Sequence, residues 1–180
     1  MQTKEILHTF YTAFSKGDAT TMTSCYHDDV VFEDPAFGKL TGKRAVAMWE
    51  MLLSKKEESE LSITFKVVDN KHAEWVANYK YGPQKRPVIN KVKASFEFLD
   101  GKIIQHTDNF SLWKWSQQAL GASGLVLGWS TFVKKKIREK TASLLQIICL
   151  SKRTDLVKRL TNHSNKFQIE LGYYALPLLC

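Results

Sequence analysis

The 180-residue sequence lacks several features that mark common classes of protein. Its three cysteines, Cys25, Cys149 and Cys180, are odd in number and lie far apart without a metal-ligand or redox motif, which indicates reduced thiols. No apolar run approaches the roughly 20 residues that cross a bilayer. The N-terminus also lacks the basic-then-apolar order of a signal peptide. We therefore expect a soluble, cytoplasmic protein.

The sequence also lacks the usual cofactor motifs. It has no glycine-rich loop with the spacing of a phosphate-binding motif. His106 and Asp108 supply only two ligand types on one expected strand, and the segment 27–29 (His-Asp-Asp) falls in an expected loop. Two ligands on one strand and a separate loop segment are a poor match to the sets of donor atoms that metal ions need. We predict no cofactor and no metal.

The net charge of +8 is unevenly distributed along the chain. Residues 1–130 contain 16 Lys or Arg against 15 Asp or Glu, whereas residues 131–180 contain 10 against 3. The main domain therefore shows no electrostatic footprint for nucleic acid. An amphipathic basic helix is expected over 129–150. It could make a weak contact with a membrane surface, but a helix docked by its apolar stripe with a solvated basic face is the commoner arrangement.

Apolar periodicity predicts helices first and strands afterwards. The expected helices cover residues 3–16, 19–26, 43–56 and 116–120, and the expected strands cover 30–34, 61–68, 73–81, 88–99 and 102–112. The Asp100-Gly101 pair is a strong signal for a short hairpin. This order predicts an α+β domain in which a strongly curved antiparallel sheet wraps the N-terminal helices. We expect a homodimer through the outer sheet face.

The most informative chemical signal is a set of polar residues in apolar strands. Side chains two positions apart share a face of a strand, so Asp34 lies beside Val30 and Phe32. The same count places His106 and Asp108 on one face. Their expected apolar neighbours on that face are Ile104, Phe110 and Leu112. Desolvation there would raise the pKa of a carboxyl group and favour proton transfer.

Three segments carry a resemblance to a known family: 13–18 (AFSKGD), 26–35 (YHDDVVFEDP) and 42–44 (GKR). With the expected order of elements, they make residues 3–115 similar to the nuclear transport factor 2-like superfamily. Its enzymes include ketosteroid isomerase, limonene epoxide hydrolase and SnoaL-type polyketide cyclases. The resemblance implies a cone-shaped cystatin-like fold with a hydrophobic pocket at the wide end, open to a small apolar organic ligand.

The resemblance also suggests roles for single residues. Asp108 is similar to the acid/base Asp of SnoaL-type cyclases, and His106 could hydrogen-bond the substrate or tune Asp108. The Asp34-Pro35 pair is similar to the Asp-Pro of ketosteroid isomerase, in which that Asp is the general base. The isomerase's Tyr position matches Phe10, for which the neighbouring Tyr11 could substitute only if the helix were rotated. Its second Asp position falls near Ala94, and both departures argue against steroid isomerisation. An epoxide hydrolase site would need an Arg on the pocket face, where none is expected. In the plain alternative, Asp34 caps a turn.

The expected pocket lining is mainly aromatic. We assign Phe10, Phe14, Phe32, Trp49, Asn90 and Phe110 to substrate binding. In the alternative reading, large aromatics, including Trp75, simply fill the curved sheet. The predicted function is a small-molecule-binding domain, with an acid/base reaction of isomerase, cyclase or hydrolase type as one option and a non-catalytic interaction module of the same fold as the other.

The chain divides into three expected parts. Residues 1–115 form the cone-shaped domain, residues 116–150 form an amphipathic helical extension docked on it, and residues 151–180 form a weakly ordered basic tail. The resemblance reaches loosely to about residue 145. Weak packing of the tail would leave it open to proteases.

Overall fold

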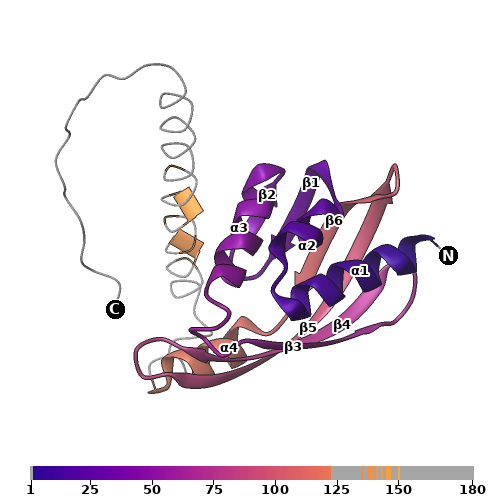
Figure 1. The fold of residues 1–180 in the computed structure, drawn as a ribbon. Helices are drawn as coiled ribbons and strands as arrows, with labels where there is room; N and C mark the ends of the chain where they lie inside the picture. The colour runs from indigo at the N-terminus through magenta and orange to yellow at the C-terminus, as the bar shows by residue number, and fades with distance from the viewer. Residues whose placement is uncertain are drawn as a thin grey trace, which may run out of the picture.

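The computed structural model describes residues 2–122 and, farther along the chain, residues 135, 138, 139, 141, 143, 145, 146 and 150. Its elements in chain order are α1 (Gln2–Lys16), α2 (Ala19–Ser24), β1 (Tyr26–Asp34), β2 (Gly38–Thr41), α3 (Lys43–Ser54), β3 (Ser62–Val67), β4 (His72–Tyr81), β5 (Arg86–Leu99), β6 (Lys102–Asn109) and α4 (Leu112–Leu120). Helices α1, α2 and α3 lie on one face of a curved sheet (Figure 1). The α+β class is confirmed.

The sheet contains six strands in the order β2-β1-β6-β5-β4-β3. The meander from β3 to β6 is antiparallel, as predicted, and Asp100 and Gly101 both adopt positive φ in the two-residue turn before β6. The sheet as a whole is mixed, however, because β1 runs parallel to β6. This pairing joins the β1–β2 hairpin to the meander within an open sheet whose edges are β2 and β3. Strand direction between such distant segments has no local sequence signal.

The helices on the concave face follow from local sequence. In α1, apolar side chains repeat every three to four residues, and Leu7, Phe10 and Phe14 are buried. The positive φ of Gly17 ends this helix. Helix α2 begins at Asp18, whose carboxylate accepts a hydrogen bond of 2.9 Å from the Thr21 N–H. These helices place an aromatic stripe against the sheet.

Strand β1 differs from the prediction at its start. It begins at Tyr26, so the segment 27–29 lies in a strand and not in a loop. The exposed carboxylates of Asp28 and Asp29 hide the alternation, and the pairing with β6 shifts register between Tyr26 and Val31. The expected loop after Asp34 also contains a short strand, β2, which pairs with β1 as a hairpin.

Strand β6 differs at both ends of its predicted pattern. Ile103 points inward and is fully buried, because an irregularity in the β5–β6 pairing near Phe98 displaces Ile104 from the face of His106. The strand ends at Asn109 and not at residue 112. Ser111 then caps α4 by accepting a hydrogen bond from the Lys114 N–H, which places residues 112–115 on a helix.

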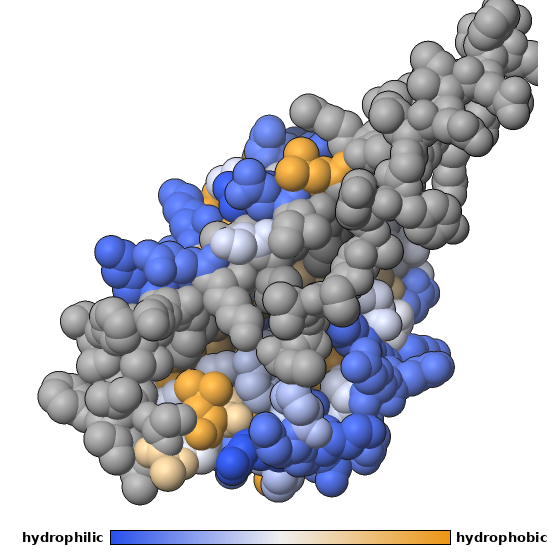
Figure 2. Space-filling view, turned by 90° about the vertical axis from the view of Figure 1, so that its left-hand side faces the viewer, coloured by the Kyte–Doolittle hydropathy of each residue, from blue (hydrophilic) through white to orange (hydrophobic). Residues whose placement is uncertain are grey.

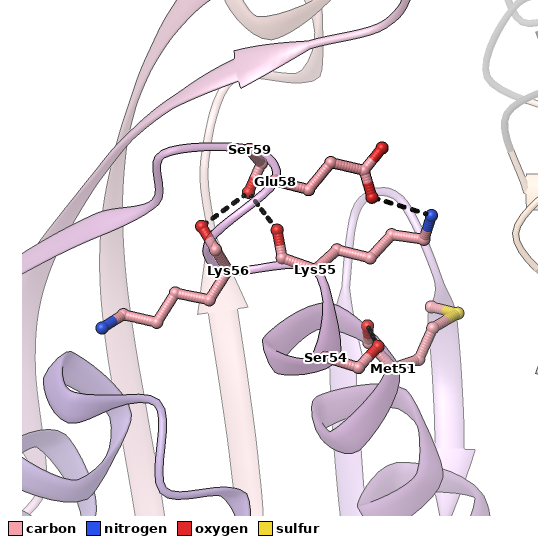
Figure 3. A network of polar contacts seen from close by, with 6 residues as sticks. All are labelled: Met51, Ser54, Lys55, Lys56, Glu58 and Ser59. Atoms are coloured by element: carbon pink, nitrogen blue, oxygen red, sulfur yellow. Dashed lines mark hydrogen bonds and ion pairs between the residues drawn. The ribbon is translucent and has the colours of Figure 1, made fainter.

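The connection from α3 to β3 is a compact turn of short polar contacts (Figure 3). The Ser54 hydroxyl donates to the Met51 carbonyl at 2.8 Å, and the Ser59 hydroxyl donates to the Lys55 carbonyl at 2.8 Å. The exposed Lys55 and Glu58 form an ion pair of 3.5 Å. The side chains of Lys55 and Lys56 extend in opposite directions from the turn. Helix α3 ends at Ser54, two residues before the predicted end at residue 56.

The described surface is largely polar. On the face shown in Figure 2, hydrophilic side chains surround small, separate hydrophobic groups. The interior is aromatic and aliphatic, and the buried core also includes Leu145 from the distal part of the chain. Among the described residues, no helix is long and apolar enough to cross a membrane.

Gly42, at the start of α3, allows a prediction about stability. Its φ of 47° and ψ of −124° suit glycine, and a Cβ atom there would lie 2.9 Å from the backbone oxygen of Asp28. We expect Gly42→Ala to lower the free energy of unfolding by about 1–3 kcal/mol, as measured by urea denaturation. Gly82→Ala is the control. Gly82 also has positive φ, but a Cβ there meets nothing nearer than 3.9 Å. Equal losses in the two variants would contradict the backbone clash.

Candidate active site

A chain of hydrogen bonds crosses the interior between the sheet and α3. Trp49 Nε1 donates to the Tyr26 hydroxyl oxygen at 2.7 Å, and that hydroxyl lies 2.7 Å from His106 Nδ1. His106 Nε2 lies 3.0 Å from Asp108 Oδ1, which also accepts a hydrogen bond of 3.2 Å from Trp75 Nε1. His106 is 0% exposed and Asp108 2%. We call these five residues the buried network.

One arrangement of protons satisfies every donor of the buried network. If His106 is neutral with its proton on Nε2, it donates to the Asp108 carboxylate and accepts from the Tyr26 O–H at Nδ1. The Tyr26 oxygen is then free to accept from Trp49. An imidazolium would instead leave the Tyr26 proton without an acceptor in the network. The geometry therefore favours neutral His106 beside an ionised Asp108.

Asp108 uses only one of its oxygens in this network. Within the part of the chain that the structure describes, both of its hydrogen bonds end on Oδ1. Oδ2 is not among the fully buried unpaired atoms there, so the remaining 3% exposure of the side chain includes this oxygen. Asp108 therefore keeps an oxygen that could accept a proton.

Aromatic rings surround His106 on all sides of its imidazole. Phe96 and Trp49 stack on it with ring centroids 4.3 and 6.0 Å away. Phe10 and Phe32 meet it edge-on at 5.4 and 5.2 Å. These rings exclude water, which strengthens every polar interaction that they enclose. The interior in which a pocket was expected therefore contains packed aromatic rings.

Asp34 lies next to Asp108 across two parallel strands. Phe32 pairs with His106 and Glu33 with Thr107, so the register sets Asp34 beside Asp108 one residue later. The half-buried Asp34 carboxylate also caps the following turn. Its Oδ1 accepts a hydrogen bond of 2.9 Å from the Ala36 N–H and a second, shorter one from the Phe37 N–H. The turn-capping alternative for Asp34 is thus observed in the geometry.

Asp34 and Asp108 differ in their electrostatic surroundings. Burial raises the pKa of Asp34 to about 7, and the negative charge of Asp108 also raises it. Hydrogen bonds from the backbone N–H groups of the turn act in the opposite direction and lower this pKa. Near neutral pH, Asp34 therefore holds a proton in part of the molecules. The interior thus brings together one carboxyl that can give a proton and one carboxylate that can take one.

The structure brings together most of the residues that the sequence analysis assigned to the site. Phe10, Phe14, Phe32 and Trp49 are all 3% exposed or less and belong to one cluster. Asn90 and Phe110 are half-buried, and the Asn90 side chain has no hydrogen-bond partner among the described residues. None of them makes a hydrogen bond to either carboxylate.

Tyr26 was missed as a member of the buried network. Its position was assigned to the end of a helix, whereas it begins β1. Extending the period of two backward from Val30 and Phe32 would have placed it on the interior face. Trp75, left among the alternatives as a filling residue, contacts Asp108 directly.

The two hollows found on the described surface are not lined by any residue of the buried network. Both are shallow, each of about 300 Å³, and lie near α1: one with α2, around His8, Lys16 and Asp18, and one around Cys25 and Lys102. Within residues 2–122 and the other described positions, no group of three or more His, Cys, Asp or Glu side chains could hold a metal ion.

The distal part of the chain contacts the turn that Asp34 caps. Thr141 Oγ1 donates to the Ala36 carbonyl at 3.1 Å, and Arg138 Nε donates to the Pro35 carbonyl at 3.4 Å. Nearby in sequence, Leu145 is fully buried in the core. Arg138 and Thr141 therefore lie against the turn that Asp34 caps.

Comparisons with known proteins now identify the kind of domain. The family model described as SnoaL-like domain matches residues 7–106. No curated protein matches the chain.

Solved structures share the fold at low sequence identity. One is an LEH-like epoxide hydrolase from M. tuberculosis, with 24% identity, a TM-score of 0.50, and coverage of 69% of this chain and 92% of its own. Another is a provisionally named isomerase from Bacillus subtilis, with 19% identity, a TM-score of 0.52, and coverage of 68% and 94%. A third is a provisionally named polyketide cyclase from Xanthomonas campestris pv. campestris, with 20% identity, a TM-score of 0.50, and coverage of 66% and 96%.

Proposed function

The chain belongs to the SnoaL-like domain family, and on this premise we propose that it binds a small, largely apolar organic molecule and transfers a proton on it with Asp108. The observation that carries the proposal is the state of Asp108. This buried carboxylate is held through Oδ1 by His106 and Trp75 and keeps Oδ2 without a partner among the described residues. A desolvated carboxylate in a fixed position is suited to general-base chemistry.

Each polar residue has a role in this proposal. Asp108 removes a proton from the bound molecule through Oδ2. His106 and Trp75 hold the carboxylate in place and stabilise its charge by hydrogen bonds. Asp34, with its pKa of about 7, is the proton donor or orienting group at the adjacent strand. The proposed binding surface consists of Phe10, Phe14, Phe32, Trp49, Asn90 and Phe110. Proton transfer of this kind serves isomerase, cyclase and hydrolase reactions alike.

A non-catalytic module is the second candidate, and the filled interior favours it. Four aromatic rings pack against His106, and the side chains of the buried network have almost no exposure. In the catalytic reading, some of these rings must move aside when a molecule enters. In the module reading, the buried network only holds α3 and the sheet together.

The two candidates differ in their response to 5-nitrobenzisoxazole, a flat apolar probe. A base removes its C3 proton, the N–O bond breaks, and a coloured cyanophenolate forms without any other reactant. We expect the protein to accelerate this reaction and Asp108→Asn to reduce the rate by about 10²-fold or more. Asp28→Asn, an exposed carboxylate on β1, is the control and should keep the wild-type rate. Equal rates for wild type and Asp108→Asn would support the module.

Three further predictions are retained as proposals. The first is a homodimer through the convex face of the sheet, where exposed charges such as the Lys93–Glu74 pair would form the contact. The second is a cytoplasmic location. The third is the division into a domain of residues 1–115, a docked extension of 116–150 and a basic tail. The contacts of Arg138 and Thr141 support the docking.

Two predictions concern segments that lie wholly or partly outside the described residues. They are the basic tail, 151–180, and a weak membrane contact through the basic C-terminus.

A further inference from the structure

The turn after β1 is held from two sides. Its N–H groups, at Ala36 and Phe37, donate to the Asp34 carboxylate. Its carbonyl groups face the distal part of the chain, where the Ala36 oxygen accepts from Thr141 Oγ1 at 3.1 Å and the Pro35 oxygen accepts from Arg138 Nε at 3.4 Å. One turn therefore links Asp34 to residues that lie outside the family match of 7–106.

Three distal residues, Arg138, Thr141 and Leu145, share one side of a helix. All three positions are helical, and spacings of three and four residues place side chains on the same face. Leu145 is 0% exposed and belongs to the hydrophobic core, whereas Thr141 is half-buried and Arg138 is exposed. The exposed neighbours on this helix include Glu139, Ser143 and Gln146. Leu145 therefore anchors the face that contacts the turn.

The proton on Asp34 depends on what this turn is packed against. Burial is the main cause that raises the pKa of Asp34 to about 7, the charge of Asp108 on β6 adds to it, and the N–H groups of the turn lower it. The other charged residues of the β1–β2 hairpin near Asp34, Glu33 and Lys39, are exposed and pair with each other in register. Arg138 meets the turn through a carbonyl oxygen. A shift of the turn would change both the burial of Asp34 and its hydrogen bonds.

We propose that Thr141 and Leu145 are positioning residues of the candidate site, which fix the turn that Asp34 caps and keep water away from its carboxyl group. The inference rests on the proposed function, because that function makes Asp34 the proton donor or orienting group. It adds that residues beyond the family match complete the site. Leu145 supplies the anchor in the core, and Thr141 sets the position of the turn through the Ala36 carbonyl.

The first test is an NMR titration of the Asp34 carboxyl carbon in the full chain, with the signal assigned by its loss in Asp34→Asn. Leu145→Asp puts a charge in the core and should detach the distal residues from the turn. We expect the pKa of Asp34 to fall from about 7 to below about 6, because water then reaches the carboxyl group. If the new carboxylate stayed docked, its charge would raise this pKa instead.

The matched control is Gln146→Asp. It adds the same charge at the next position, where the side chain is exposed, and should leave Asp34 with the wild-type pKa. An equal fall in Leu145→Asp and Gln146→Asp would contradict the role of docking.

The second test removes one hydrogen bond and leaves the core intact. In Thr141→Val, the amide hydrogens of Ala36 and Phe37 should exchange about 5-fold faster than in wild type, because the turn loses a donor to the Ala36 carbonyl. Exchange in the paired strands β4 and β5 should not change. Thr141→Ser keeps the hydroxyl and should restore the slow exchange, which separates the lost hydrogen bond from a change of shape. Ser143→Ala, which removes an exposed hydroxyl that donates to the Glu139 carbonyl, is the control.

The remaining outcomes overturn the inference without touching the assignment of Asp108. If Asp34 has an ordinary pKa in wild type, or keeps its wild-type pKa in a folded Leu145→Asp, the distal residues do not shield it. If Leu145→Asp does not fold, exchange in Thr141→Val decides, and wild-type rates at Ala36 and Phe37 would refute the proposal. Failure of the proposed function itself appears separately, as equal rates of wild type and Asp108→Asn with 5-nitrobenzisoxazole.

Discussion

Replacing His106 with leucine is expected to lower the free energy of unfolding by about 3–5 kcal/mol. The substitution keeps much of the side-chain volume but removes both ring nitrogens. Asp108 would lose the hydrogen bond to Oδ1 from Nε2, and the Tyr26 O–H would lose its acceptor. Both groups are 3% exposed or less, so water would not replace the lost partner. Urea denaturation with an unchanged m-value measures the loss.

The protein contains a matched control for this substitution. His72 and Asp69 form a second His–Asp pair at 2.9 Å, but their side chains are 57% and 54% exposed. His72→Leu should cost little, because exposed pairs contribute at most about 1 kcal/mol. The double variant His106→Leu, Asp108→Leu should recover a large part of the loss of His106→Leu, since no buried charge remains. A loss below about 1 kcal/mol for His106→Leu would contradict the buried network.

Asp34 is expected to make the protein less stable as the pH rises from about 4 to 7. In the unfolded chain its pKa is about 3.9, whereas in the folded protein it is about 7. Between these values the folded state holds a proton that the unfolded state has released, so rising pH favours unfolding. The stabilisation is complete below pH 4 and is lost as the pH passes 7. Because Asp34 is half-buried and partly screened by solvent, we expect a loss of about 2 kcal/mol.

Removing the titrating group tests this assignment. Asp34→Asn keeps an oxygen for the N–H groups of Ala36 and Phe37 but carries no proton that titrates. Its stability should therefore stay level where that of wild type falls. Asp28→Asn, on the exposed side of the same strand, should follow the wild-type curve. If Asp34→Asn loses stability with pH as wild type does, the group that titrates lies elsewhere.

The local pattern of the sequence predicted the elements well but some of their ends poorly. The stripe of α1, the Asp100-Gly101 turn and the shared face of His106 and Asp108 depend on residues close in the chain, and each is found in the structure. The predicted start of β1, the predicted face of Ile104 and the predicted end of β6 were wrong. Each of these depends on pairing with a distant strand or on a capping side chain.

The sequence by itself determined the family and the chemical types available to the site, because segments 13–18 and 26–35 and the period-two faces are local properties. Tertiary structure alone decided which of these residues meet. The parallel pairing of β1 with β6 sets Asp34 beside Asp108, and Tyr26 reaches His106 across 80 residues of chain. The packing of α1 and α3 on the sheet also decided that aromatic rings fill the interior and leave the Tyr11 hydroxyl without a hydrogen-bond partner among the described residues. Such contacts depend on the free energy of the whole packed core, which no local pattern encodes.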